Sequence, residues 1–283
     1  GFGHDGQFVI ADDTYREACR DREPPQARCT VRRRRSPFYV GKDPDGWGVF
    51  RRDGTWTRQH IHTAWDFSEP EPQGNIDPQG CAFDARGNLW GNDVGHGAAS
   101  TADGSLVVFF PGKRRRYDTY CFLDKGLRAP GMPVFDAAGD LYLAETAGAR
   151  VLRFSPPFPR SARECANPER LVTTPPTKSV FLTLAASGEA TPAGIVYLPA
   201  GPAPSFIVGS VLIPPVIRQY GADGGLVRTL VPEGVPRNPL GLDVGSDGTL
   251  YYAELNLDPA TFAPRCGGVA AVRLTGADPP GAP

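Results

Sequence analysis

Four acidic residues recur at the ends of short apolar segments, and together they could bind a cation or activate water. Each follows a run of branched or aromatic residues that is typical of a β-strand. If the segments are equivalent repeats, their carboxylates gather at one end of the molecule, where they could hold a divalent cation or raise one another's pKa values. The alternative is that each carboxylate accepts hydrogen bonds from backbone N–H groups at its own strand end. These residues are Asp12, Asp93, Glu145 and Glu254.

Histidines offer a different set of candidate metal ligands. His60 and His62 flank Ile61, so both side chains lie on one face if this segment is a strand. Such a pair of side chains is suited to binding one transition metal ion. His96, in the glycine-rich loop after Asp93, could be a further ligand at one end of the molecule. No HExxH or comparable motif links these histidines, and solvated or structural roles are the simpler interpretation. The sequence also lacks a GxSxG nucleophile elbow and a GxGxxG phosphate loop after a strand.

Two runs of basic residues are candidates for binding an anionic partner. The whole chain has Lys+Arg 30 and Asp+Glu 31, a net charge of -1, which does not favour nucleic acid. The remaining interpretations are pairing with acidic segments, docking on an anionic surface or polysaccharide, and charged edge strands that resist aggregation. The runs consist of Arg32, Arg33, Arg34, Arg35, Lys113, Arg114, Arg115 and Arg116.

Cysteine usage indicates the compartment. The six cysteines are Cys19, Cys29, Cys81, Cys121, Cys165 and Cys266, and no two form a CxxC pair. This spacing argues against structural zinc, thioredoxin chemistry and covalent haem, and favours three disulfides in a secreted, periplasmic or cell-surface protein. Six reduced thiols in a cytosolic core are the alternative. We expect the pairs Cys19–Cys29, Cys81–Cys121 and Cys165–Cys266. The chain starts with Gly1, which suggests a processed mature protein, and no apolar run approaches the roughly 20 residues of a membrane span.

The elements that must position these residues repeat along the chain. Residues 80–95, 133–148 and 241–256 share one order, in which an apolar strand, a tight turn closed by glycine and an aromatic-rich strand end in an acid. An Asp or Asn before the glycine supplies turn hydrogen bonds, and the glycine accepts a positive φ. We expect weaker copies at residues 194–210 and 3–13, and strands near residues 38–40, 48–51 and 55–62 leave room for another unit.

The repeats predict an all-β fold, the six-bladed β-propeller. Third strands are expected at residues 105–110, 149–156, 215–221 and 269–276, and no strand–helix alternation occurs. One small sheet cannot bury both faces, but sheets arranged around an axis bury each face against a neighbour. We expect a single propeller domain over residues 1–276 and a Pro-rich extended tail over residues 277–283. A sandwich of two antiparallel sheets is the alternative fold.

The order Asp-x-x-Gly-x-Leu-aromatic-x-x-acid, followed by Arg-Val-Leu-Arg-Phe, over residues 136–154 resembles an NHL repeat. The chain is similar to the NHL and SMP-30/gluconolactonase-like group of six-bladed propellers, most clearly over residues 79–154 and 238–276. This resemblance implies a divalent cation, calcium first, in the central channel, with Asn, Asp and Glu ligands before the glycine of each innermost strand. Those positions hold Gln79, Pro130, Ala193 and Leu240, of which only Gln79 has a side-chain oxygen to coordinate calcium.

The sequence therefore favours an extracytoplasmic propeller that acts as a binding or assembly module, with or without a channel cation. Its partner would be a protein or polysaccharide bound through the Pro-rich loops, and self-association into a homo-oligomer or larger assembly is left open. Whether the chain is an enzyme also stays open. The alternative function is a metal-dependent hydrolase of the lactonase or esterase type, in which the four acids hold the ion that activates water. A third hypothesis places a redox metal on the histidines.

Overall fold

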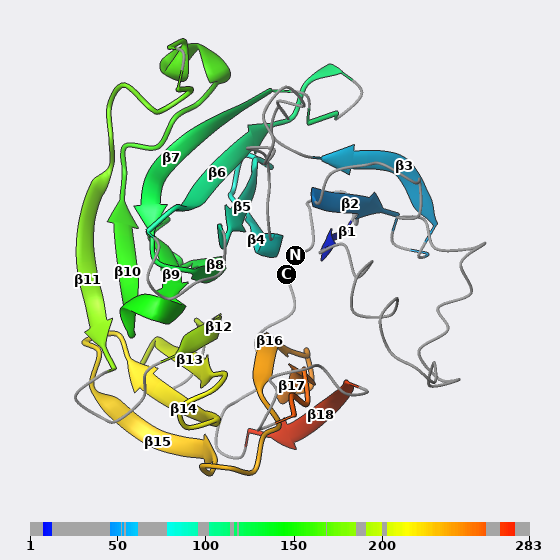
Figure 1. The fold of residues 1–283 in the computed structure, drawn as a ribbon, viewed down its shortest axis with the longest axis vertical. Coiled ribbons are helices and arrows are strands. Elements are labelled where there is room, and N and C mark those ends of the chain that lie inside the picture. Colours follow the sequence, from blue (N-terminus) through cyan, green and yellow to red (C-terminus); the bar gives the residue numbers. More distant parts are fainter. Residues whose placement is uncertain are drawn as a thin grey trace. The chain divides into compact units, whose positions relative to one another are not determined.

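The chain is built almost entirely of β-strands, as predicted. This computed structural model describes residues 8–12, 46–51, 53, 55–61, 78–95, 102–113, 116–117, 119–167, 169–184, 191–199, 203–258 and 267–274. Figure 1 shows the strands grouped into small antiparallel sheets. Two short 3-10 turns, η2 (Thr146–Gly148) and η3 (Ala162–Cys165), lie among them. Across the described residues, no helix has the length and apolar character needed to cross a membrane.

The chain divides into two compact units. The first unit comprises Gly1–Ala129 and Pro157–Pro176, and the second comprises Pro130–Pro156 and Thr177–Pro283. Sheets in both units follow the predicted order, in which consecutive strands pair as an antiparallel meander. The expected single domain over residues 1–276 remains a prediction, and the expected tail lies outside the described residues.

The first unit contains two sheets. The three-stranded sheet is formed by β1 (Phe8–Asp12), β2 (Gly46–Phe50) and β3 (Trp56–Ile61), and the four-stranded sheet by β4 (Pro78–Phe83), β5 (Leu89–Asp93), β6 (Gly104–Phe110) and β7 (Thr119–Leu127). A shared apolar core joins the two sheets. At its centre the Trp47 indole N–H donates to the Gly80 carbonyl at 3.1 Å. A Cβ atom at position 91 would overlap the same indole, which explains why β5 has a glycine there.

The second unit contains three sheets, which pack face to face in chain order. They are formed by β8 (Pro130–Phe135), β9 (Leu141–Glu145), β10 (Arg150–Ser155) and β11 (Thr177–Thr183); by β12 (Pro192–Leu198), β13 (Ser205–Ser210), β14 (Val216–Gly221) and β15 (Leu226–Val231); and by β16 (Pro239–Val244), β17 (Thr249–Glu254) and β18 (Gly268–Arg273). One apolar core joins the first sheet to the second, and another joins the second to the third. Their first strands also approach closely, because a Cβ at Gly131 would overlap the Ala193 backbone and one at Gly194 the Leu240 carbonyl. This stacking of successive meander sheets is the architecture of a β-propeller.

The glycine turns form as the repeat predicts. The Asp136 carboxylate accepts hydrogen bonds from the backbone N–H groups of Ala138 and Asp140, each at 2.9 Å. Gly139 closes this turn with a φ of 86°, a conformation that glycine adopts without steric cost. In the β4–β5 turn Asp84 has the same role. In the β16–β17 turn the equivalent position is Gly245, and Asp247, directly before Gly248, accepts from the Thr249 N–H at 3.0 Å instead.

The N-terminal region differs from the prediction. Two repeats were expected before residue 79, but β1 pairs with β2 and β2 with β3, so the expected strands contribute to one sheet. The described residues therefore form five sheets, against six expected blades. The short apolar segments of this region satisfy the strand pattern, but pattern alone does not specify which strands pair. The strand expected at residues 38–40 lies outside the described residues.

Candidate functional site

Equivalent residues close the second strand of four sheets. In the strand register, Asp93 faces Pro78, Glu145 faces Pro130, Ser210 faces Pro192 and Glu254 faces Pro239. In each case the first strand begins at this proline and its register shifts before the next regular pair. Proline suits a strand's first position because it has no N–H to donate. The proline that opens each first strand, with a glycine one or two residues later, was a signal in the sequence that our repeat analysis missed.

Glu145 is buried and its carboxylate is already engaged. Its side chain is 1% exposed, and Oε2 forms an ion pair with Nε of Arg150, the residue opposite it on β10. Gly148 closes over the same oxygen, since a Cβ there would overlap Glu145 Oε2. The Glu145 side chain therefore stabilises the β9–β10 connection.

Asp93 and Glu254 also have local donors. Asp93 Oδ1 accepts from the backbone N–H of Gly95 at 3.0 Å, and Glu254 Oε1 accepts from that of Arg237 at 2.8 Å. Asp12 ends β1, which is the first strand of its sheet and not the second, and its side chain lies outside the described part. Within the described ranges no cluster of three His, Cys, Asp or Glu side chains could hold a metal ion. The local interactions are those of the strand-capping alternative.

Polar side chains at the same strand ends of the second unit connect neighbouring sheets. Thr146 Oγ1 donates to the Pro192 carbonyl at 2.8 Å, and Asn238 Nδ2 donates to the Val211 carbonyl at 2.9 Å. Within the β12–β15 sheet, Thr191 Oγ1 accepts from the backbone N–H groups of Leu212 and Ile213 at 2.8 and 3.0 Å. All these bonds satisfy backbone groups at the sheet ends, and those of Thr146 and Asn238 also join adjacent sheets.

A second polar cluster lies on the β8–β10 surface. The Tyr142 hydroxyl donates to Asp136 Oδ2 at 3.3 Å, and Arg153 Nε donates to Asp140 Oδ2 at 2.8 Å. Burial raises the pKa of Tyr142 to about 12, and the nearby Asp136 charge adds to the increase. The hydrogen bond that Arg153 donates to Asp140 in turn raises the pKa of Arg153. Tyr142 and Arg153 keep their protons at neutral pH, and their hydrogen bonds to Asp136 and Asp140 support the β8–β9 turn.

The histidine hypothesis stays a prediction. His60 is on β3, where its backbone pairs with Gly48, but its side chain lies outside the described part of the chain. His62 and His96 are both outside the described residues.

The observed disulfide contradicts two of the predicted pairs. Cys121 on β7 bonds to Cys165 in η3, with their Cα atoms 5.8 Å apart, so the expected Cys81–Cys121 and Cys165–Cys266 pairs are wrong. Cys81 is on β4, at the opposite edge of the β4-β5-β6-β7 sheet. Three strand spacings amount to about 14 Å, which exceeds the reach of a disulfide. Cys19, Cys29 and Cys266 lie outside the described residues.

Residues 157–176 of the first unit form a segment that we call the insertion. The disulfide attaches the insertion to the outer strand β7. The insertion runs beside β7 through a parallel bridge between Phe122 and Leu171. The Phe122 N–H donates to the Arg170 carbonyl at 2.8 Å, and the Val172 N–H donates to the Phe122 carbonyl at 3.0 Å. Backbone bonds and a covalent bond therefore fix the insertion.

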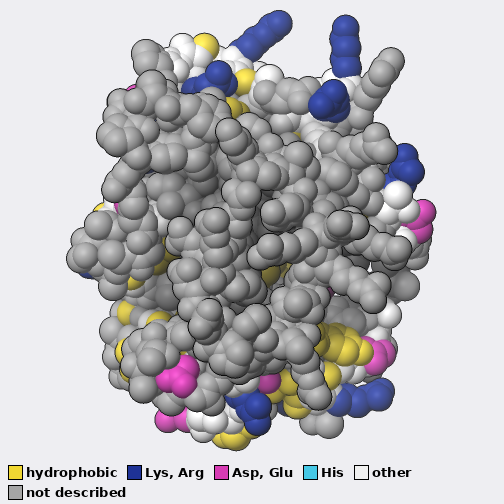
Figure 2. Space-filling view, turned by 45° about the vertical axis from the view of Figure 1, so that its right-hand side comes forward, with side chains coloured by type: hydrophobic (Ala, Val, Ile, Leu, Met, Phe, Trp, Pro, Cys, Tyr) yellow, Lys and Arg dark blue, Asp and Glu magenta, His cyan; other side chains and the backbone are white. Residues whose placement is uncertain are grey.

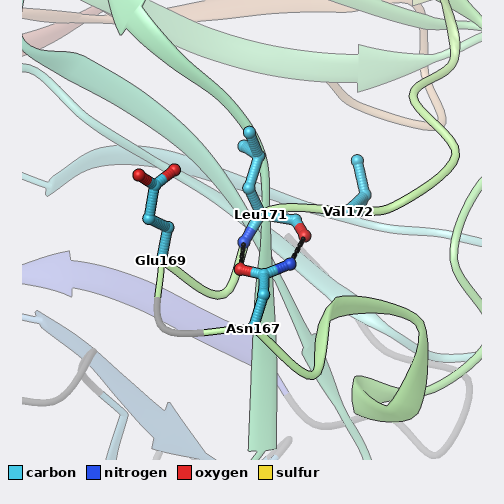
Figure 3. A pocket seen from close by; sticks show the side chains of 4 residues that line it. All are labelled: Asn167, Glu169, Leu171 and Val172. Atoms are coloured by element: carbon cyan, nitrogen blue, oxygen red, sulfur yellow. Dashed lines mark hydrogen bonds between the residues drawn. The ribbon is translucent and has the colours of Figure 1, made fainter.

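A pocket lies in the insertion, lined by Asn167, Glu169, Leu171 and Val172 (Figure 3). Asn167 bonds both backbone groups of Leu171, donating to its carbonyl at 2.6 Å and accepting from its N–H at 3.1 Å. Figure 3 shows the Glu169 carboxylate extending away from this pair of bonds. The pocket thus combines a fixed backbone, apolar walls and one exposed carboxylate.

Two cationic side chains lie over aromatic rings where the insertion contacts β7. Lys125 Nζ donates to the Glu169 carbonyl at 2.9 Å and lies 4.3 Å from the centre of the Phe122 ring. The Arg170 guanidinium carbon is 4.7 Å from the centre of the Tyr120 ring. Such cation–π contacts hold long side chains in place while their charge stays in water.

The two predicted basic runs are only partly described. Lys113 and Arg116 are exposed in the β6–β7 turn, where the Gly112 N–H donates to the Arg116 carbonyl at 2.6 Å. The other members of the runs, Arg32, Arg33, Arg34, Arg35, Arg114 and Arg115, lie outside the described residues.

Comparison with known proteins identifies the fold class. No protein-family model matches the sequence, and no curated protein is significantly similar to it. The match to a solved structure of a luciferin-regenerating enzyme covers 82% of this chain and 72% of the enzyme's chain, with a TM-score of 0.54 and 14% sequence identity. A gluconolactonase from Xanthomonas campestris matches 73% of this chain and 61% of its own, with a TM-score of 0.50 and 13% identity. The match to a calcium-binding regucalcin from Agrobacterium tumefaciens covers 74% of this chain and 61% of the regucalcin chain, with a TM-score of 0.49 and 19% sequence identity.

These matches confirm the predicted fold. The chain is a β-propeller with the fold of the SMP-30/gluconolactonase-like group. At such low identities the similarity concerns the fold alone, because this architecture supports many unrelated functions.

Proposed function

We propose that the protein is an extracytoplasmic propeller module that binds an anionic polysaccharide or an acidic protein segment through the insertion on β7. The supporting observation is that the insertion is attached by both a disulfide and backbone hydrogen bonds. A segment fixed in this way loses little conformational entropy when a ligand binds, so more of the contact energy contributes to affinity.

The charges around the pocket favour an anionic partner. Lys125 and Arg170 are exposed and oriented by aromatic rings, and Arg128 and Arg163 are exposed on the same two segments. Guanidinium and ammonium groups bind carboxylate and sulfate through charge-assisted hydrogen bonds. Glu169 at the pocket would accept a hydrogen bond from a sugar hydroxyl or a backbone N–H, which adds a requirement for shape to the requirement for charge.

The disulfide supports an extracytoplasmic location. Cys121 and Cys165 are both buried, and disulfides of this kind persist mainly in oxidising compartments.

Calorimetric titration with a uronic-acid polysaccharide and with a poly-glutamate peptide tests the proposal. We expect binding to one of them that weakens with added salt. Lys125→Ala and Arg170→Ala should each weaken it by about tenfold. Arg86→Ala, which removes an exposed cation from the β4–β5 turn, is the matched control and should bind as the wild type. The double variant Cys121→Ala/Cys165→Ala should also bind more weakly, because the insertion is then held only by hydrogen bonds. Binding to neither ligand, or equal loss in the Arg86 control, would contradict the proposal.

A metal-dependent hydrolase of the lactonase type is the second candidate function. The fold match to a gluconolactonase favours it, together with the recurrence of carboxylates at equivalent strand ends. In this candidate Asp12, Asp93, Glu145 and Glu254 would bind a divalent cation, with calcium as the first choice. The described donors do not fit such a cage, since the carboxylates of Asp93, Glu145 and Glu254 accept hydrogen bonds from local donors.

Metal analysis separates the two candidates. The hydrolase candidate requires stoichiometric metal in purified protein, lactone hydrolysis, and loss of both in Glu145→Gln and Asp93→Asn. The binding-module proposal expects folded protein whose polysaccharide or peptide binding is unchanged by a chelator.

A further inference from the structure

The insertion adds a short extra strand to the β4-β5-β6-β7 sheet. This sheet ends at β7, and the parallel bridge places Leu171 opposite Phe122. The two backbone bonds to Phe122 come from the neighbours of Leu171, since the Arg170 carbonyl accepts one and the Val172 N–H donates the other. In such a pair the residue between them points its own N–H and C=O to the opposite edge. Leu171 therefore presents both backbone groups on the side away from β7.

The Asn167 side chain occupies this outer edge. Its Nδ2 donates to the Leu171 carbonyl at 2.6 Å, and its Oδ1 accepts from the Leu171 N–H at 3.1 Å (Figure 3). A partner strand would make the same two bonds, because opposite residues in a hydrogen-bonded antiparallel pair exchange both N–H and C=O contacts. The carboxamide of Asn167 thus takes the place of one residue of a partner strand.

An external strand could replace Asn167 at little cost. The exchange would break two hydrogen bonds and form two of the same type. The pocket lined by Asn167, Glu169, Leu171 and Val172 lies at this edge and gives an entering chain space beside the Asn167 side chain. The backbone that presents Leu171 is held by the disulfide and by the bonds to Phe122, so it needs no further ordering.

We propose that the insertion binds an acidic peptide segment in extended conformation, which pairs with the Leu171 backbone in place of Asn167 and adds a further strand to the sheet. The proposal rests on the proposed function of the insertion and names its partner as a protein segment and not a polysaccharide. Addition of a strand to a sheet edge gives affinity through main-chain hydrogen bonds, which a polysaccharide cannot supply. Among the described strands, none pairs with the insertion on this side.

Cationic side chains flank the path of such a segment. Lys125 Nζ donates to the Glu169 carbonyl at 2.9 Å, so its charge lies at the insertion itself. A strand paired with Leu171 would run about 5 Å further out, within reach of a glutamate side chain. Arg163 in η3 and Arg170 are exposed. Figure 2 shows Lys and Arg side chains projecting from its upper edge, the level at which η3 lies in Figure 1.

The Glu169 carboxylate adds a second requirement for the partner. It is exposed and extends away from the Asn167–Leu171 bonds (Figure 3). A glutamate of the partner would be repelled at this position, whereas a hydroxyl could donate a hydrogen bond to the carboxylate. Successive side chains of a strand point to opposite faces, so a segment that alternates acidic and hydroxyl residues satisfies both requirements.

Calorimetric titration of the intact protein with synthetic peptides tests the proposal. The probe is a peptide of alternating Glu and Thr of about ten residues, the upper length of a typical strand. In an extended peptide all Glu N–H groups point to one edge and all Thr N–H groups to the other. Methylation of the nitrogens of one residue type therefore blocks one edge only. We expect one methylated peptide to lose affinity by about tenfold and the other to bind as the parent peptide does.

Asn167→Ala removes the competing carboxamide. It should strengthen peptide binding by about threefold or more, because no internal bonds are then lost when the peptide pairs with Leu171. The matched control is Thr173→Ala, which removes a different side-chain hydrogen bond of the insertion, the one donated to the Glu164 carbonyl, and should leave peptide affinity unchanged. Hydrogen exchange of the Phe122 amide, which donates to the Arg170 carbonyl, checks that the insertion stays on β7. Weaker peptide binding by Asn167→Ala with a protected Phe122 amide would overturn the proposal.

Other results would overturn strand addition and leave the proposed function standing. They are equal affinity for the two methylated peptides, binding of the uronic-acid polysaccharide without binding of the peptide, and self-association of Asn167→Ala without peptide, which would make a second copy the occupant. In each of these cases Lys125→Ala should still weaken ligand binding, as the proposed function requires. Unchanged binding by Lys125→Ala, with unequal methylated peptides, would instead contradict the role of charge and support strand pairing.

Discussion

The β8–β11 and β16–β18 sheets have nearly the same sequence order but different surroundings. Gly139-Asp140-Leu141-Tyr142 in one corresponds to Gly248-Thr249-Leu250-Tyr251 in the other, and both second strands end in Ala-Glu. Tyr142 is 4% exposed and Tyr251 is 43% exposed. The ring of Tyr142 lies 4.4 Å from that of Phe206 on β13, measured between centroids. Among the described residues of the second unit, no strand follows β18 to give Tyr251 a similar contact.

This difference shows that the repeat sequence determines the shape of a sheet, whereas burial of the sheet's second face depends on the sheet that packs against it. The repeat residues set the turn and the alternation of side chains, which are local properties. The free energy of burial then comes from the sheet that packs on top. Equivalent substitutions in the two sheets should therefore have unequal effects.

The largest expected difference is between Tyr142→Ala and Tyr251→Ala. Removing Tyr142 leaves a cavity beside Phe206 and Phe181, which should lower the free energy of unfolding by about 3 to 5 kcal/mol. Removing Tyr251 should cost less than about 0.5 kcal/mol. Urea unfolding measures both losses. Equal losses would show that the two faces are equally covered.

Changing the two strand-closing glutamates should give a smaller difference. Glu145→Gln removes the negative partner of Arg150 from a buried position and should lower the free energy of unfolding by about 1 to 2 kcal/mol. Glu254→Gln keeps an oxygen that can accept from the Arg237 N–H, so we expect a loss below about 0.5 kcal/mol. The same urea titration measures both variants. A larger loss for Glu254→Gln would mean that its carboxylate has a role beyond local capping.

The last expected effect appears only at alkaline pH. Because the pKa of Tyr142 is raised to about 12 in the folded state, from 10.0 when unperturbed, the unfolded chain loses this proton first as pH rises. The contribution of Tyr142 to stability is therefore fully present below pH 10 and is lost between about pH 10 and pH 12. Tyr142→Phe should show a shallower decline in unfolding free energy across this window, measured relative to the wild type. Identical slopes would contradict the assigned burial of the hydroxyl.

The sequence predicted the parts of the fold that depend on local chemistry. The glycine turns at residues 87, 139 and 248, the strands around them and the propeller class follow from short-range patterns. The pairing of β1 with β2 did not follow, since it joins segments more than thirty residues apart that carry no distinguishing signal. The Cys121–Cys165 bond was missed for a related reason, because it depends on how the insertion lies against β7, which cysteine spacing does not determine.

The candidate site was predicted less well than the fold. The equivalence of Asp93, Glu145 and Glu254 was correctly read from the repeat, and the register confirms that each faces a strand-opening proline. Their local hydrogen bonds could not be read from it, because Gly95 and Arg237 lie in connections whose conformation is not repeated. Arg150 begins strand β10, but the residues that face Asp93 and Glu254 at the equivalent position are Ser105 and Gly268. Carboxylates at equivalent strand ends therefore have different partners in different blades.

The most direct measurement is hydroxyl-radical labelling of Tyr142 and Tyr251, read by mass spectrometry. We expect Tyr142, which is 4% exposed, to be protected and Tyr251, which is 43% exposed, to be labelled. Labelling of the two residues to the same extent would contradict the claim that these equivalent residues differ in what covers them.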